Sequence, residues 1–410
     1  MTDSFPPYHE HLPELARELT ERGSQGLVVI DASPLEVIEE QYGSDAFEEV
    51  RQRLFKILRE QRGKEFRSED VLTLDRPGGL RFIFFLERKR RRSNPTTIAD
   101  LKVVQTRMAA SLVPNLGRAT FPYCKTPPRI EVGYGMAVYN PLLHPSRIAL
   151  TAFREALEIA RHLREAERLV AREQLLDIIL RERVITAFQP IMRLGPDRTV
   201  LGFEALSRGP RGSGLERADD LFGSATEHQL LVELDRLCRR RALLSSGRIP
   251  TGAKIFVNTL PATIRDPQFR GKSLIDFLDK AQVSPDRIVI EITEKLVIEN
   301  YNLFREAMAY FTDLGMSFAV DDVGSGYSGL ESIARLKPTF LKIDMSLVRD
   351  VHASLVNRAM VEAIVAMGHG IGAAVIGEGI HSNEEAGALL DAGVDWGQGF
   401  LLGRPDAGPE

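Results

Sequence analysis

The feature of the sequence that most constrains its fold is a repeat in the second half of the chain. From about residue 184 onward, short apolar runs that end in a polar residue alternate with helical stretches. Strand–helix units repeated in this way are typical of a (β/α)8 barrel, whose functional groups gather at the carboxyl ends of the strands. We therefore predict an α/β fold class with a TIM-type barrel in this half. The runs are VLGFEALSR, AKIFVNT, RIVIEIT, SFAVDDV, TFLKIDM, AAVIGEGI and WGQGFLL.

The polar residues that end these runs are nearly all oxygen ligands. Carboxylate and amide oxygens select Mg²⁺ or Mn²⁺ over zinc. The adjacent carboxylates of Asp321 and Asp322 repel each other unless a cation lies between them or one of them holds a proton. Two divalent cations about 3.5–4 Å apart commonly promote the attack of water on a phosphodiester, so we expect two such ions here. Taken singly, each of these residues could be a helix cap or a surface group. The residues that end the runs are Glu204, Asn258, Glu291, Asp321, Asp322, Lys342, Glu378 and Gln398.

The composition of the chain narrows the remaining classes of function. A net charge of −4 gives no reason to expect a nucleic-acid polymer as partner. The sequence has no run of about 18 apolar residues, so we expect no membrane span, and its N-terminus lacks the apolar core of a signal peptide. Cys124 and Cys238 lie far apart and suggest neither a disulfide framework nor a thiolate metal site. We therefore expect a cytoplasmic protein.

A series of short motifs runs through the second half in a fixed order. Glu204-Ala205-Leu206 is preceded by FQPI and followed by VNTL, EITE, DDVGSGYSGL, LKID, GEGI and QGFLLGRP. From about Leu176 to Pro405, this series resembles the EAL domain, the cyclic di-GMP phosphodiesterase module. The resemblance implies a phosphodiesterase that hydrolyses cyclic di-GMP to linear pGpG.

The resemblance also implies which residues hold metal. One Mg²⁺ or Mn²⁺ ion would be bound by Glu204, Asn258, Glu291 and Asp321. Asp321 would be shared with a second ion, which Asp322 would also bind. Glu204 and Asp322 thereby belong to the expected catalytic group.

The remaining roles concern water, substrate and a loop. Lys342 would position the attacking water and offset charge on the scissile phosphate, and Glu378 would be a metal ligand or the base for that water. Glu294 would brace the loop that follows Asp322. The expected substrate contacts are Gln189, Arg208 and Gln398.

Two departures from the family pattern stand near these residues. His381 replaces a Glu that usually follows the GEGI motif, which could retune metal or substrate contacts without removing a principal ligand. Val323 and Ser325 stand where Phe and Thr are commoner, and Ser325 keeps the hydroxyl group.

A long amphipathic helix is predicted from about Thr151 to Arg183, because apolar residues recur every three or four positions and the stretch contains no Gly or Pro. Such a helix either packs on one domain or links two domains and carries rotation or dimer register between them. We expect a domain at residues 1–165, a linker helix at 166–183 and the barrel at 184–410.

The first half carries a weaker resemblance. Its apolar runs GLVVIDA, LRFIFFLE and RIEVGYGMAVY favour a smaller α/β or α+β domain, and with DRPGGLRFIFFL they resemble a GGDEF domain, the diguanylate cyclase module. Leu80 and Arg81 replace the acidic residues of its signature; Asp31 is retained, and Glu39 stands where an Asn would read guanine. Because the cyclase needs carboxylate-bound metal on the triphosphate, we expect a degenerate GGDEF-like domain without cyclase activity. The run RSED (Arg67–Asp70) faintly resembles the product-binding Arg-x-x-Asp site of such domains, but it lies a little too far from Gly78, and a solvated loop is favoured. The run RKRRR is also interpreted as a solvated loop.

Two other functions compete with the phosphodiesterase. A receptor would hold cyclic di-GMP without turnover and signal through a protein partner, and it would tend to lose metal ligands that this chain retains. A barrel enzyme that stabilises an enolate would need a base on another strand and would leave the EITE and QGF motifs unexplained. We further expect a homodimer in which the first domain, or a regulatory partner, sets barrel activity through the helix and the loop Val323–Tyr327.

Overall fold

The computed structural model describes residues 5–67, 69–86, 96–124, 128–260, 266–295, 301–325 and 330–406. The chain divides into two compact units, Met1–Val170 and Ala171–Glu410. The RKRRR run, Ser68 of the RSED run and the end of the loop Val323–Tyr327 lie outside the described residues. In the described part of the chain, no helix combines the length and the apolar character needed to cross a membrane.

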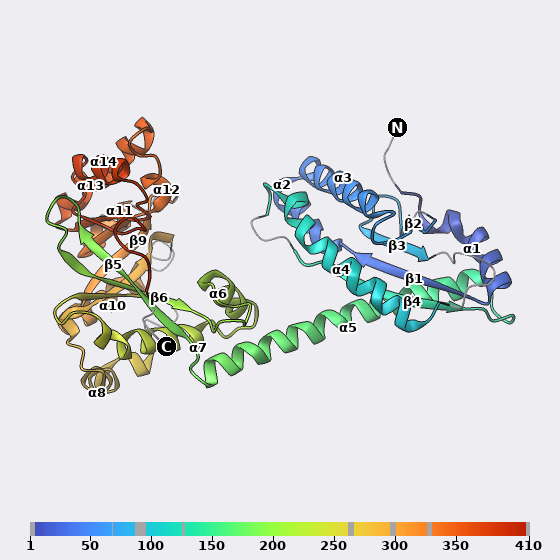
Figure 1. Cartoon of the computed structure of the whole chain (residues 1–410), viewed down its shortest axis with the longest axis horizontal. Coiled ribbons are helices and arrows are strands. Elements are labelled where there is room, and N and C mark those ends of the chain that lie inside the picture. The colour runs from blue at the N-terminus through green and yellow to red at the C-terminus, as the bar shows by residue number, and fades with distance from the viewer. Residues whose placement is uncertain are drawn as a thin grey trace. The chain divides into compact units, whose positions relative to one another are not determined.

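The first unit is a four-stranded antiparallel sheet in the order β2-β3-β1-β4, covered by helices on both faces (Figure 1). Alternate residues of a strand point to opposite faces, and in β1 Val28 and Ile30 pack with α3 and α4, whereas Leu27 and Val29 pack with α1 and α5. The strands are β1 (Ser24–Asp31), β2 (Val71–Leu74), β3 (Arg81–Leu86) and β4 (Glu131–Val138), and the helices are α1 (Tyr8–Arg22), α2 (Val37–Tyr42), α3 (Ser44–Gln61) and α4 (Ile98–Thr120).

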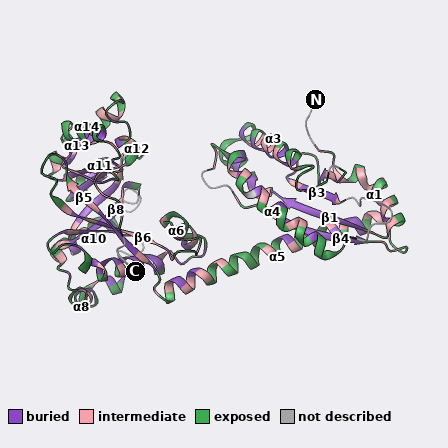
Figure 2. Cartoon of the chain, in the orientation of Figure 1, coloured by how far each residue is buried: buried purple, intermediate pink, exposed green. Residues whose placement is uncertain are grey.

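Helix α5 (Pro145–Leu180) crosses the boundary between the units. Its first part lies directly on β4, since a Cβ atom added at Gly133 would meet the Ala156 carbonyl oxygen at 1.9 Å. Leu175 and Ile178, near its end, are buried in a cluster of the second unit. Between these parts every residue from 164 to 170 is exposed (Figure 2).

The second unit is a closed barrel of eight strands in the order β5-β6-β7-β8-β9-β10-β11-β12, as predicted. In the predicted (β/α)8 barrel all strands would run parallel, but β5 runs antiparallel to both β6 and β12. This strand carries the FQPI motif and completes the barrel beside the seven runs read from the sequence. The strands are β5 (Ile185–Arg193), β6 (Val200–Arg208), β7 (Lys254–Asn258), β8 (Ile288–Thr293), β9 (Ser317–Val323), β10 (Phe340–Ile343), β11 (Ala374–Gly377) and β12 (Trp396–Gly397).

Helices surround this barrel and bury its outer face in a large apolar cluster (Figure 2). A smaller cluster with members from six strands fills the inside, and Phe256 and Phe340 pack there with ring centroids 5.3 Å apart. The helices are α6 (Ala218–Glu227), α7 (Leu231–Leu244), α8 (Gly271–Ala281), α10 (Tyr301–Asp313), α11 (Leu330–Leu336), α12 (Met345–Val348), α13 (Leu355–Ile371) and α14 (Asn383–Asp391).

Candidate active site

The candidate site lies one layer above the apolar cluster inside the barrel. Side chains two residues apart on a strand share a face, so each interior residue of a parallel strand is followed, two positions later, by a polar residue on the same side. Val289 thus precedes Glu291, and Phe340 precedes Lys342. In β5 the order is reversed, and Gln189 precedes the interior Ile191, because this strand runs the other way. The strand ends therefore converge on one polar layer.

Lys342 lies at the centre of this layer and is fully buried. Its Nζ atom is 2.7 Å from Glu378, 2.8 Å from Glu291, 3.2 Å from Asp321 and 3.5 Å from Glu204. One ammonium group thus faces four carboxylates. A cation so placed lowers the repulsion between the carboxylates but leaves an excess of negative charge.

The carboxylates form two overlapping groups that could hold metal ions. Glu204, Glu291 and Asp321 each offer an oxygen within 4.8 Å of the others, and so do Asp321, Asp322 and Glu378. Asp321 belongs to both groups. Asn258 donates its Nδ2 amide to Glu204 Oε1 at 3.0 Å, which places its side chain beside the first group.

Burial and crowding change the pKa values of these groups. Burial raises the pKa of Glu291, Asp321 and Glu378 against the opposing effect of Lys342. Burial, with the charges of Asp321 and Asp344, raises the pKa of Asp322 to about 6. The pKa of Glu204 falls below its usual value because Lys342 and two amide donors outweigh its burial. The cluster therefore carries more negative charge than its surroundings stabilise.

The donor set fits a divalent cation that prefers oxygen ligands. Both carboxylate oxygens of Glu291 are buried and have no hydrogen-bond partner within the described part of the chain, although Lys342 lies close. Buried acceptors left in this state are costly, and a cation bound to them would satisfy their lone pairs. Carboxylate and amide oxygens are the ligands of Mg²⁺ and Mn²⁺.

The turn after the aspartate pair is held in a specific conformation. Asp322 has a left-handed backbone with φ of 58°, and its N–H donates to Asp321 Oδ1 at 3.0 Å. Glu294 is fully buried, and its Oε2 atom accepts a hydrogen bond of 3.0 Å from the Gly324 N–H. Gly324 has a φ of 94°, a conformation that favours glycine, and a Cβ atom there would also meet the side chain of Leu347 at 2.3 Å.

The expected substrate contacts are placed in different surroundings. Gln398 donates to Glu204 Oε2 at 2.6 Å and to Gln189 Oε1 at 3.0 Å, and both glutamines are buried beside the acidic cluster. Arg208 ends β6, where its guanidinium donates to the Ser207 carbonyl oxygen at 2.9 Å. The structure thus joins Gln189 and Gln398 to the cluster, whereas Arg208 lies at the strand end and forms no ion pair with a carboxylate of the described residues.

Two residues near the site add to the sequence-based interpretation. Asp344, in the LKID motif, raises the pKa of Asp322 and caps α12 by accepting from the Ser346 N–H. The sequence feature that could have identified Asp344 is a carboxylate directly after a buried strand. The ring of His381 donates to the Gly379 carbonyl oxygen and lies 5.3 Å from the Phe400 ring.

The first unit has a carboxylate that pairs with an internal cation. Asp31 lies opposite Arg81 in the antiparallel register of β1 and β3. Arg81 Nε donates to Asp31 Oδ2 at 2.9 Å, and its guanidinium lies 3.9 Å from Asp75. The retained acidic residue of this unit is therefore already neutralised.

The fold and the site together define a closed barrel with an acidic rim of carboxylates, gathered around one lysine, that could hold metal ions. The chain belongs to the EAL domain family, whose match covers residues 172–405, more than half of the chain.

Relatives of the chain share this domain. The chain is 29% identical over 191 residues to the cyclic di-GMP phosphodiesterase PdeA of Borreliella burgdorferi, covering 46% of this chain and 28% of PdeA. It is 38% identical over 118 residues to the cyclic di-GMP phosphodiesterase PdeR of Escherichia coli, covering 29% of this chain and 18% of PdeR. The chain therefore spans less than a third of the length of either relative.

A solved structure of similar fold is the PaMucR phosphodiesterase in its c-di-GMP complex. It aligns with a TM-score of 0.51 at 25% identity and covers 57% of this chain and 97% of that one. The aligned part is therefore an isolated domain of about the size of the barrel unit.

Proposed function

We propose that the chain is a phosphodiesterase that hydrolyses cyclic di-GMP to linear pGpG with two Mg²⁺ or Mn²⁺ ions. The observation that supports this proposal best is the pair of overlapping oxygen clusters that share Asp321, in a chain of the EAL family. The names of PdeA and PdeR agree with this substrate.

The metal ligands we propose are the residues of the two clusters. Glu204, Asn258, Glu291 and Asp321 would hold one ion, and Asp321 with Asp322 the other. Bound there, the ions would lower the pKa of a water molecule and offset charge on the phosphodiester.

The other side chains of the rim act on substrate and protons. Glu378, whose pKa is raised by burial, is suited to accept the proton that the attacking water loses. Lys342 would position the attacking water and offset charge on the scissile phosphate. We assign substrate contacts to Gln189, Gln398 and Arg208, since a guanidinium suits phosphate oxygens.

The competing function is a cyclic di-GMP receptor without turnover. All the proposed metal ligands are retained, which favours the enzyme. The experiment is to incubate the chain with cyclic di-GMP and Mg²⁺ and to analyse the nucleotides by chromatography. Accumulation of linear pGpG supports the enzyme, whereas tight binding with intact nucleotide supports the receptor.

We propose a regulatory role for the first unit, as a degenerate GGDEF-like domain at residues 1–165 joined by a linker helix at 166–183 to the barrel at 184–410. The pairing of Arg81 with Asp31 supports the loss of cyclase activity, because it neutralises the one carboxylate left for metal. The free thiols of Cys124 and Cys238 agree with a cytoplasmic location.

We also propose a homodimer coupled through α5, with a regulatory protein or sensor as a further possible partner. Leu169 and Val170 are 53% and 64% exposed on the stretch of α5 between the two packed parts. Apolar side chains exposed on a long helix are suited to pair with a second copy.

A further inference from the structure

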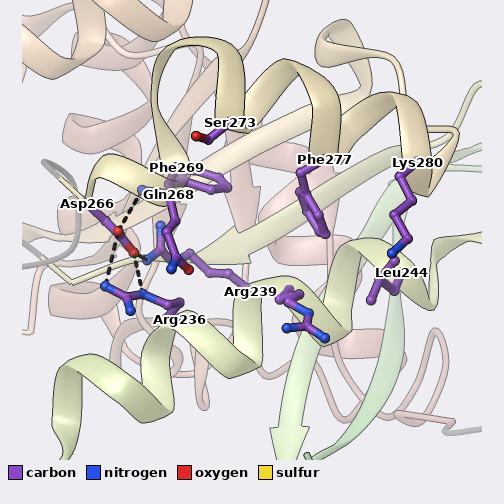
Figure 3. Close-up of a pocket in the computed structure, with 10 residues that line it drawn as sticks. Arg236, Arg239, Leu244, Asp266, Gln268, Phe269, Ser273, Phe277 and Lys280 are labelled. Atoms are coloured by element: carbon purple, nitrogen blue, oxygen red, sulfur yellow. Dashed lines mark hydrogen bonds and ion pairs between the residues drawn. The ribbon is translucent and has the colours of Figure 1, made fainter.

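A second cavity lies on the outside of the barrel, between α7 and α8, and it shares no residue with the acidic rim. Its volume is about 370 Å³. Figure 3 shows side chains of both helices and of the segment before α8 pointing into it. The lining residues that matter for its chemistry are Arg236, Arg239, Arg240, Lys280, Phe269 and Phe277.

The cavity is lined by more cationic than anionic side chains. Four cationic side chains line it against a single carboxylate, that of Asp266. Arg236 donates two hydrogen bonds, of 2.8 and 3.2 Å, to this carboxylate (Figure 3). Arg240 pairs outside the lining, with Glu182 at 2.7 Å. Lys280 makes no ion pair within the part of the chain that the structure describes. An excess of donors over acceptors therefore faces the cavity.

The buried member of this group is Arg239, of which 2% is exposed. Its Nε atom lies 3.0 Å from Asp235 and its guanidinium 3.6 Å from Asp266. None of its guanidinium nitrogens has a well-aligned hydrogen bond within the described residues. A guanidinium carries five N–H donors in a fixed fork, and these two carboxylates offset its charge without well-aligned hydrogen bonds to its nitrogens. Arg239 is thus a buried donor group that lines an open cavity.

The cavity also has apolar lining residues, among them two aromatic rings. The Arg239 guanidinium stacks 4.4 Å from the centre of the Phe269 ring, which orients its donors. Phe277 is half-buried, and its ring faces the space between the helices (Figure 3). Such walls suit an apolar, planar group beside the cationic donors.

Size and chemistry together select a class of ligand. The cavity reaches the range of small-molecule sites, roughly 300–1,000 Å³, and is too large for a phosphate ion alone. Arginine and lysine donors bind phosphate oxygens, and the Phe277 ring can stack on a base. We propose that this cavity binds a nucleoside monophosphate, with the phosphate at the cationic residues and the base against the Phe277 ring.

The test measures AMP binding to the full chain by isothermal titration calorimetry in EDTA. AMP carries a base and a phosphate but not the guanine of the proposed rim substrate. Adenosine and ribose 5-phosphate serve as the two halves of the probe. We expect AMP to bind at least about tenfold more tightly than either half, because adenosine lacks the phosphate contacts and ribose 5-phosphate lacks the base contacts.

Matched variants locate the binding. Lys280→Glu is expected to weaken AMP binding at least about tenfold, whereas Lys272→Glu, the same charge change on an exposed lysine of α8, leaves it unchanged. Phe277→Leu is expected to weaken AMP binding and to leave ribose 5-phosphate binding unchanged, because it removes the aromatic face and keeps an apolar side chain.

Three results would overturn the proposal. The first is no saturable AMP binding with a Kd below about 1 mM. The second is equal loss of binding in the two lysine variants, since this would reflect net charge alone. The third is binding that survives Lys280→Glu and disappears in Arg208→Ala, since AMP would then occupy the rim.

Discussion

The ammonium group of Lys342 lies 2.8 Å from the carboxylate of Glu291, and neither side chain reaches solvent. Removing one member of a buried ion pair leaves the other charge uncompensated. Here the loss would affect four carboxylates, because Lys342 also contacts Glu204, Asp321 and Glu378.

We therefore predict that Lys342→Met lowers the free energy of unfolding by about 3–5 kcal/mol in EDTA. Mg²⁺ should restore part of the lost free energy of unfolding, because it would supply positive charge to the same carboxylates. Thermal unfolding followed by circular dichroism, with and without Mg²⁺, measures both effects. The control is Lys272→Met on the surface, which should cost less than about 0.5 kcal/mol. Equal losses in the two variants would contradict a central role for Lys342.

The raised pKa of Asp322 predicts a pH dependence of the metal-free protein. The folded carboxyl, with a pKa of about 6, binds its proton more tightly than the unfolded one does. Unfolding then releases protons, so the stability contributed by this group is present at low pH and falls as the pH rises towards 6.

The variant Asp322→Asn tests this dependence, because asparagine tolerates the left-handed backbone of residue 322. In EDTA, the Tm of the wild type relative to that of Asp322→Asn should fall between about pH 4 and pH 7. A difference in Tm that stays constant over this range would show that Asp322 titrates normally.

A further prediction concerns the hydrogen bond from the Gly324 N–H to Glu294. Glu294→Ala should lower metal affinity and kcat/KM by about 10–100-fold, as is usual for groups that orient ligands. Glu294→Gln keeps an acceptor oxygen, so metal affinity and kcat/KM should fall less in this variant. Metal titrations of turnover measure both variants, and unchanged titrations in Glu294→Ala would show that the loop conformation does not depend on this bond.

The exposed apolar residues of α5 predict a dimer. Leu169→Glu combined with Val170→Glu should shift the protein towards monomer in sedimentation velocity at micromolar concentration, and turnover per barrel should change by roughly 5–150-fold if the units are coupled. The control Arg168→Glu changes an exposed charge on the same turn. A wild-type monomer with the same turnover as the double variant would leave the first unit without a regulatory role.

The rim could be predicted from the sequence because strand geometry fixes it. Side chains alternate along a strand, so a polar residue two positions after an interior residue such as Val289 must lie at the barrel end. The position of Lys342 among four carboxylates could not be predicted, since it depends on how strands distant in sequence close the barrel. The reversed direction of β5 was missed for the same reason, because direction depends on pairing with β12 and leaves no trace in the local pattern.

The most direct test of the account is the metal dependence of cyclic di-GMP turnover by the full chain. After exhaustive chelation we predict no pGpG, with activity restored by Mg²⁺ or Mn²⁺ and inhibited by Ca²⁺, whose looser coordination disturbs the in-line geometry. Asp321→Asn, which removes a carboxylate shared by both clusters, should abolish this restoration at all metal concentrations. Full turnover in the chelated protein, or wild-type restoration in Asp321→Asn, would contradict a metal-dependent mechanism at this rim.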